Sequence, residues 1–202
     1  KILKEFETDR TLAAGPAVDD SSVVVVDTDG IMLATDQTGK TRWTADLGAE
    51  PLTIPVIQSG QIILRLSNST VVSYDVADGS RRWLFAQQNP ALVLRQNAAI
   101  AVDLSSAYVG MASGRMVALS LSSGASRWEA RISVPRGANE IERITDVIGL
   151  PSVSGSTVCA AAYRGRFTCL DASDGATVWS QDIKAGSSVS VDSRQVVVAD
   201  ID

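Results

Sequence analysis

Few side chains of this sequence have the type and spacing that catalysis or metal binding needs. The chain of 202 residues has no histidine, which removes the commonest general base and the commonest metal ligand. A Ser-His-Asp triad is therefore impossible, although a Ser-Lys pair stays open. The scattered acids that share no evident pocket are Asp103, Asp146, Asp192 and Asp200. We expect no enzyme, no metal site and no cofactor.

The two cysteines, Cys159 and Cys169, are too few for a structural zinc site without help from other ligands. They flank an expected β-hairpin whose two-residue turn is Arg164-Gly165. That register places Cys159 opposite Leu170, so the two sulfur atoms point to opposite faces of the sheet. A disulfide is the alternative, but the register predicts two free, buried thiols.

The composition is that of a globular chain without a basic surface. Hydrophobic residues make up 45% and charged residues 20% of the chain, and the net charge is −5. Nucleic acid is not an expected partner, because a groove for it needs a basic footprint. No apolar run approaches the length of a membrane span, and no signal peptide opens the chain. Lys1 is an unusual first residue, so we expect the sequence to begin inside a longer protein.

Four copies of one turn-and-strand pattern organise the chain. Each copy has a glycine followed four residues later by a tryptophan, and the tryptophans are spaced by 40, 45 and 51 residues. The glycines are Gly39, Gly79, Gly124 and Gly175, and the tryptophans are Trp43, Trp83, Trp128 and Trp179. Periods near 40 with alternating apolar residues predict the four-stranded blades of a β-propeller, not helical repeats.

The repeated glycine and tryptophan have separate expected roles. Each glycine is expected at φ > 0 in the third turn of its blade, where a side chain would be strained. Each tryptophan falls on the outer strand, where burial between neighbouring blades would hide about 150–250 Å² of surface. A substrate-stacking surface is the alternative, but the fixed place of the tryptophan in the repeat favours packing.

The sequence therefore predicts an all-β fold, a partial ring of four-stranded antiparallel blades. We expect one partial propeller domain over residues 1–202, with partial blades at 1–8 and 187–202. The four complete blades are expected at about 14–48, 55–88, 98–133 and 149–183.

Two links between blades are longer than the repeat requires. The extra residues fall at 84–97 and 129–150. In an up-and-down blade, the second turn and the link to the next blade lie at the same end. We therefore expect both insertions on one face, where repeat proteins often bind their partners.

The residues of these links suit a protein partner. In the first link, Leu92 and Leu94 share a side of an extended segment next to Arg95, a plausible hot-spot arrangement. The alternative is that the leucines fill the core of the ring. The second link offers polar rim contacts or, alternatively, a solvated loop with internal ion pairs. Its charged residues are Glu140, Glu142, Arg143 and Asp146.

The blade pattern resembles the quinoprotein-type propellers, in which Leu-Asp or Tyr-Asp at a strand end is followed by x-x-x-Gly-x-x-x-Trp. Two stretches, NPALVLRQN at 89–97 and RGANEIERITDV at 136–147, are similar to the BamB family. That family comprises eight-bladed lipoprotein subunits of the outer-membrane β-barrel assembly (BAM) machinery. The resemblance implies a non-enzymatic scaffold at the periplasmic face of the outer membrane. It also implies an outer-membrane lipid anchor outside this chain.

The resemblance further implies binding to a periplasmic POTRA domain of BamA, with nascent outer-membrane proteins as further candidate partners. The family's partner-binding positions correspond here to Leu92, Leu94, Arg95 and Asp146, and Glu140 and Arg143 match its loop pattern. Many relatives have a second acid where this chain has Ile148.

Two other functions share the scaffold. A quinone (PQQ)-dependent dehydrogenase typically has a calcium site and adjacent cysteines, and the chain has no Cys-Cys pair. A generic periplasmic propeller that binds another protein or a carbohydrate is the third hypothesis.

Overall fold

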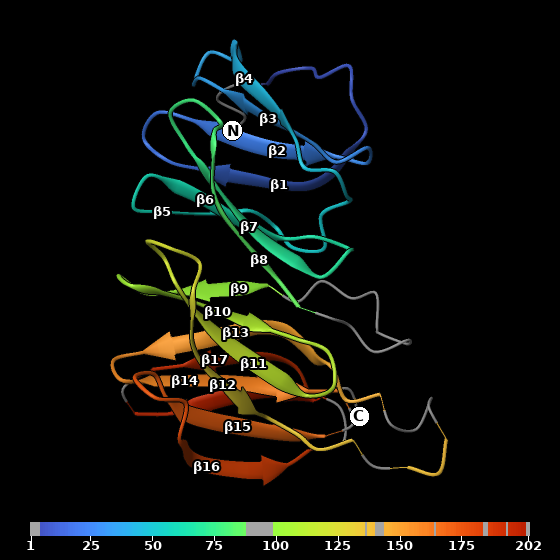
Figure 1. Cartoon of the computed structure of the whole chain (residues 1–202), viewed down its shortest axis with the longest axis vertical. Helices are drawn as coiled ribbons and strands as arrows, with labels where there is room; N and C mark the ends of the chain where they lie inside the picture. Colours follow the sequence, from blue (N-terminus) through green and yellow to red (C-terminus); the bar gives the residue numbers. More distant parts are fainter. Residues whose placement is uncertain are drawn as a thin grey trace. The chain divides into compact units, whose positions relative to one another are not determined.

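The structure is a computed structural model that describes residues 5–87, 99–135, 137–139, 144–163, 165–183, 186–192 and 194–200. The described residues form strands and no helix, in four four-stranded antiparallel sheets and one two-stranded sheet (Figure 1). Within every sheet the strands follow the order of the sequence, so that each strand pairs with the next by a hairpin. This is the up-and-down blade that the repeat predicts, and the all-β propeller fold class is confirmed.

The chain divides into two compact units, residues 1–84 and 85–202. The first sheet comprises β1 (Leu12–Val18), β2 (Val23–Asp27), β3 (Ile31–Thr35) and β4 (Thr41–Asp46). The second comprises β5 (Val56–Gln58), β6 (Gln61–Arg65), β7 (Thr70–Asp75) and β8 (Arg81–Ala86). Residues 5–8, part of the segment expected to be a strand of a preceding blade, carry no strand, and residues 1–4 lie outside the described residues.

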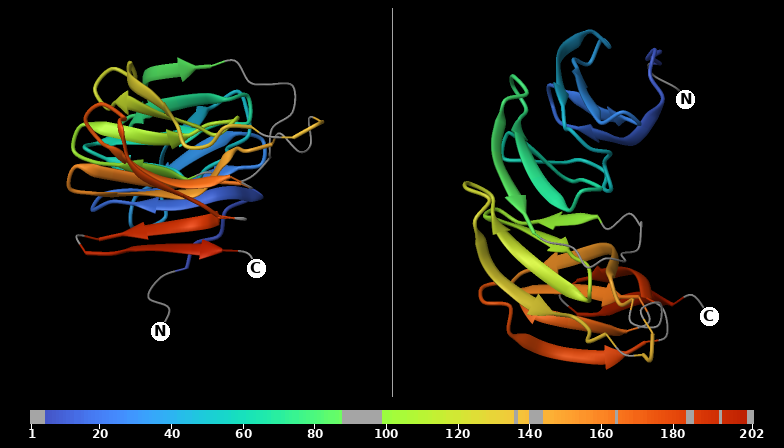
Figure 2. Two further views of the ribbon diagram at one scale, coloured as in Figure 1. Left: turned by 90° about the horizontal axis from the view of Figure 1, so that it is seen from below. Right: turned by 45° about the vertical axis from the view of Figure 1, so that its right-hand side comes forward.

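The second unit contains the remaining sheets. The third sheet comprises β9 (Ile100–Val102), β10 (Ser106–Gly110), β11 (Arg115–Ser120) and β12 (Ser126–Arg131). The fourth comprises β13 (Val147–Ser154), β14 (Thr157–Ala162), β15 (Arg166–Asp171) and β16 (Thr177–Asp182), and the fifth comprises β17 (Gly186–Val191) and β18 (Val196–Asp200). Inside this unit β13 packs against β9 and β10, and β17 packs against β13 and β14 (Figure 2).

The burial pattern follows from this stacking of sheets. The middle strands β6, β10 and β14 are buried along nearly their whole length, as expected for strands covered on both faces. The outer strands β4, β8, β12 and β16 are mostly exposed and carry the repeated tryptophans. Apolar side chains of the third and fourth sheets, among them Tyr108, Met116 and Leu170, form one shared core.

The contacts of the repeated tryptophans account for the Gly-Trp spacing. The indole of Trp43 lies over Gly79 in the next sheet, and that of Trp128 lies over Gly175. A Cβ atom on Gly79 would lie 2.5 Å from Cε3 of Trp43, and one on Gly175 would lie 2.7 Å from Cε3 of Trp128. Gly39, Gly79, Gly124 and Gly175 have φ of 88°, 74°, 70° and 76°. At Gly79 and Gly175, glycine is therefore required for two reasons: the backbone has a positive φ, and the ring that covers the residue leaves no room for a Cβ atom.

Each of these two indoles is also fixed by a hydrogen bond. Trp43 Nε1 donates to the carbonyl of Val76 at 2.9 Å, and Trp128 Nε1 donates to that of Ala172 at 3.0 Å. Both carbonyls lie three residues before the glycine that the ring covers. The same turn thus receives the face and the polar edge of one indole, as a buried tryptophan requires.

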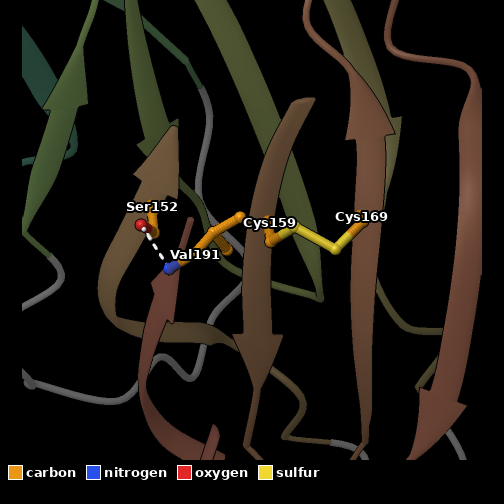
Figure 3. The surroundings of a disulfide bond; sticks show 4 residues. All are labelled: Ser152, Cys159, Cys169 and Val191. Carbon is orange, nitrogen blue, oxygen red and sulfur yellow. Dashed lines mark hydrogen bonds between the residues drawn. A yellow bond between two sulfur atoms is a disulfide. The ribbon is translucent and has the colours of Figure 1, made fainter. Parts of the chain in front are cut away.

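The prediction of two free thiols is wrong. Cys159 and Cys169 lie directly opposite each other in β14 and β15 and form a disulfide with a Cα–Cα distance of 4.0 Å (Figure 3). The connection between the strands contains residues 163–165, one more than the two-residue turn expected from Arg164-Gly165. That extra residue shifts the register by one and brings both side chains to the same face. A disulfide closing a loop of this length stabilises the fold by about 2–3 kcal/mol, mainly by restricting the unfolded chain.

Candidate functional site

The structure describes only part of the predicted binding residues. Leu92, Leu94, Arg95, Glu140 and Arg143 lie outside the described residues, as does Glu142. Asp146 is described, together with both ends of the second long link, the segment 132–146 that joins β12 to β13. Residues 133–135 and 137–139 of this link project past the strand ends (yellow-orange in Figure 1). The candidate site is therefore built from the two ends of this link.

The first end of the link is held by the turn between β10 and β11. Ser113 and Gly114 of this turn have φ of 58° and 68°, the left-handed region that favours glycine. The carbonyl of Gly114 accepts hydrogen bonds from Ile132 N–H at 2.8 Å and Ser133 N–H at 3.2 Å. A Cβ atom on Gly114 would collide with the carbonyl oxygen of Ser133 and would lie 3.1 Å from that of Thr145. Both ends of the link therefore lie against this one glycine.

The second end of the link is held by the same turn. Ser113 N–H donates to Oδ1 of Asp146 at 2.9 Å, and Val147 N–H donates to the carbonyl of Met111 at 3.2 Å. Asp146 is only 7% exposed, so its carboxylate is buried against the turn. Its backbone carbonyl accepts from Tyr163 N–H at 2.9 Å, which connects this end to the turn between β14 and β15.

The β14–β15 hairpin also holds the first end of the link, through Thr168 of β15 and Gly165 of the turn. Thr168 Oγ1 donates to the carbonyl of Ile132 at 3.0 Å. A Cβ atom on Gly165 would collide with the side chain of Ser133. The two second turns, 111–115 and 162–166, thus enclose both ends of the link, an arrangement we call the clasp. Surface loops whose ends lie close together are frequently functional.

One polar group of the clasp stands out. The hydroxyl of Thr145 is buried and has no hydrogen-bond partner within the part of the chain that the structure describes. A buried hydroxyl without a partner costs about 1–3 kcal/mol. The second end of the link therefore packs against the turn although the buried Thr145 hydroxyl makes this packing less favourable.

A cleft of about 350 Å³ lies beside the first end of the link. Its walls include Val134, which is 51% exposed, and an ion pair in which Arg166 Nε donates to Asp182 Oδ1 at 2.5 Å. Its lining residues are Arg131, Ile132, Ser133, Val134, Gly165, Arg166 and Asp182. The cleft thus combines one exposed apolar side chain with charged groups.

A larger hollow of about 760 Å³ lies in the first unit, against β2 and β3. Its buried acid, Asp27, already pairs with Arg10 at 2.6 Å. Burial acts to raise the pKa of Asp27, but hydrogen bonds from Ile31 N–H and from Arg10 outweigh it and hold that pKa below its usual value. This carboxylate is engaged in holding its own loop and has the wrong pKa for a general base at neutral pH.

Among the described side chains, the scattered acids of the sequence do not converge. Asp103 accepts from Tyr108 Oη at 2.6 Å, Asp192 accepts from Arg194 N–H at 2.7 Å, and the side chain of Asp200 lies outside the described part. Burial and the neighbouring Asp103 raise the pKa of Tyr108 to about 12, so its hydroxyl remains a donor. Among the described residues, no three acidic or cysteine side chains gather where they could hold a metal ion. No helix long and apolar enough to cross a membrane occurs in this part of the chain.

Comparison with known families decides the relationship. The family model of the outer membrane protein assembly factor BamB matches residues 3–202. The chain belongs to the BamB family. The Bordetella pertussis member is 32% identical over 195 residues, which cover 96% of this chain and 50% of that protein. The Xanthomonas campestris member is 34% identical over 205 residues, which cover 99% of this chain and 50% of that protein. The chain thus spans about half the length of these BamB relatives.

A solved BamB structure has the same fold. BamB from Moraxella catarrhalis superposes with a TM-score of 0.90 at 26% identity, covering 100% of this chain and 62% of that chain. The quinohemoprotein alcohol dehydrogenase of Comamonas testosteroni superposes with a TM-score of 0.61 at 15% identity. The match covers 84% of this chain and 35% of the dehydrogenase chain. The second likeness concerns the fold alone. The named relatives at higher identity are BamB assembly factors.

Sequence reasoning missed most of the clasp. Ser113, Gly114, Ser133 and Thr145 were not expected to take part in the site. The Ser-Gly pair at 113–114, between two apolar strands, is a hairpin signal that marks the turn. Nothing in the sequence indicates that this turn receives both ends of a link that begins 18 residues later.

Proposed function

We propose that this chain is part of a non-enzymatic scaffold subunit of the outer-membrane β-barrel assembly machinery. The observation that carries the proposal is the BamB family match over residues 3–202. The described acids support it, since they serve separate turns and do not converge on a reaction centre. A non-catalytic propeller acts through its surface, and loops at one end of its blades are the usual contact points.

The proposed partner is a periplasmic POTRA domain of BamA. Leu92, Leu94 and Arg95 of the first link would provide the apolar and cationic contacts, and the second link, with Glu140 and Arg143, would lie beside them. The clasp supports this assignment because it presents the second link from a fixed base. Nascent outer-membrane proteins are a further proposed class of partner.

The proposed location is the periplasmic face of the outer membrane, reached through a lipid anchor. The Cys159–Cys169 disulfide supports an oxidising compartment, because such bonds form and persist in the bacterial periplasm and are rare in the cytosol. The disulfide is fully buried at the boundary of β14 with β17, where it is part of the core.

A binding assay tests the proposal. The parent protein is measured against the purified periplasmic POTRA region of BamA from the same organism. The combined variant Leu92→Ala, Leu94→Ala, Arg95→Ala is expected to bind at least tenfold more weakly, since apolar–Arg hot spots contribute about 2 kcal/mol or more. The matched control is Leu104→Ala, a leucine that is 89% exposed in the first turn of the third sheet, at the opposite strand end.

Unchanged binding by the triple variant would remove this site assignment. Absence of binding by the unmodified protein would remove the partner. Dye reduction that depends on added quinone and calcium would instead support the dehydrogenase function.

A further inference from the structure

The clasp gives each end of the second link a hydrogen bond to the same turn. On one side, Ile132 and Ser133 donate to Gly114; on the other, Ser113 donates to Asp146. The turn therefore contributes its carbonyl to the first end and its N–H to the second. The distance between the two ends is set by one dipeptide, Ser113-Gly114.

Asp146 provides a side-chain hydrogen bond from the second end of the link to this turn. Its carboxylate is buried and directed at Ser113 N–H, and its carbonyl receives Tyr163 N–H from the neighbouring hairpin. Asp146 thus connects two turns of adjacent sheets. A side chain in this position controls where the link leaves the protein surface, and it has little surface left to offer a partner.

We infer that Asp146 is a positioning residue for partner binding. It fixes the link between β12 and β13 by accepting the Ser113 N–H, and its negative charge is not read by the partner. The inference rests on the proposed function, because binding is its functional readout.

Two substitutions separate positioning from direct contact. In Asp146→Asn the amide oxygen still accepts the Ser113 N–H, although the bond is weaker without the charge. In Asp146→Ala the partly buried N–H of Ser113 loses its acceptor, which costs part of the desolvation of that group. We expect Asp146→Ala to bind the POTRA region roughly tenfold more weakly and Asp146→Asn to restore binding to within about threefold of the unmodified protein.

Hydrogen exchange of the free, full-length protein measures the clasp without a partner. In Asp146→Ala the amides of Ser113, Ile132 and Ser133 are expected to exchange at least tenfold faster. In Asp146→Asn they are expected to stay protected. Circular dichroism of each variant establishes that the sheets are intact.

A second pair of variants acts on the clasp without changing a charge. Gly114→Ala pushes against the carbonyls of Ser133 and Thr145 and is expected to weaken binding. Gly155→Ala is the matched control, because Gly155 also has a positive φ, 57°, but has no neighbour within 4 Å of its Cβ position. If Asp146→Ala does not fold, this pair decides the role of the clasp.

The outcomes are distinct. Binding by Asp146→Asn as weak as that of Asp146→Ala would overturn the inference, since the charge itself would then be needed. Unchanged exchange in Asp146→Ala would overturn it as well, because the clasp would not depend on this side chain. If the unmodified protein does not bind the POTRA region, the proposed function and the binding half of the inference both fail. The hydrogen-exchange data would then still show whether Asp146 holds the link in place.

Discussion

Trp128 and Trp179 occupy the same place in successive repeats but have different surroundings. Trp128 is 8% exposed, lies over Gly175 and donates to the carbonyl of Ala172. Trp179 is 41% exposed and packs against Phe167, with ring centroids 4.9 Å apart. The sheet that follows Trp128 provides a third turn, whereas the described part of the sheet that follows Trp179 has only β17 and β18. A repeat position therefore defines a packing role only where the next repeat provides the receiving turn.

Removing each indole should give the largest difference in stability between the two positions. Trp128→Ala is expected to lower the free energy of unfolding by about 4 kcal/mol, because it leaves a cavity and an unpaired carbonyl. Trp179→Ala is expected to lower it by about 1–2 kcal/mol, since less surface is buried there. Urea denaturation followed by circular dichroism measures both losses. Equal losses would show that exposure does not determine the contribution of these residues.

Adding a methyl group to the receiving turn should give the next largest effect. Gly175→Ala is expected to cost about 3 kcal/mol, from the strained positive φ and from the collision with the Trp128 ring. Gly155→Ala shares the positive φ but adds its methyl group to open space, and is expected to cost about 1–2 kcal/mol. The difference between the two unfolding free energies measures the contact with the ring. A difference near zero would mean that the indole moves aside freely.

The acid response of the receiving turn should give the smallest effect. Asp171 begins this turn, and hydrogen bonds from the hydroxyl and the N–H of Ser173 lower its pKa below the usual 3.8. A lowered pKa in the folded state stabilises the protein above about pH 3.8, and this contribution is lost as the pH falls through the native pKa. Denaturation series at pH 7 and pH 3 should show a smaller acid loss in Asp171→Asn.

Ser173→Ala provides the matched variant for that measurement. It removes the hydroxyl donor but keeps the carboxylate and the backbone N–H, so its pH dependence should lie between those of the unmodified protein and Asp171→Asn. Acid losses that are the same in all three proteins would contradict a stabilising role for this hydrogen bond.

Much of the fold follows from local patterns in the sequence. Alternating apolar residues and turn residues predict strands because both signals act over a few neighbouring residues. The place of each glycine before each tryptophan indicates a positive φ, and the structure has one at all four glycines. The candidate site was less predictable. Asp146 was expected as a partner contact, and the burial of its carboxylate against Ser113 was not foreseen.

The blades, their turns and the strand that carries each tryptophan can be predicted from the residues alone, because these features depend on short-range periodicity and turn chemistry. The packing of the folded sheets brings Cys159 opposite Cys169, since one added turn residue costs little locally but reverses which side chains meet. It also decided that a two-residue turn closes the link between β12 and β13. The hydrogen bonds between this turn and the link join residues 18 to 33 positions apart, and their geometry exists only once the sheets have stacked.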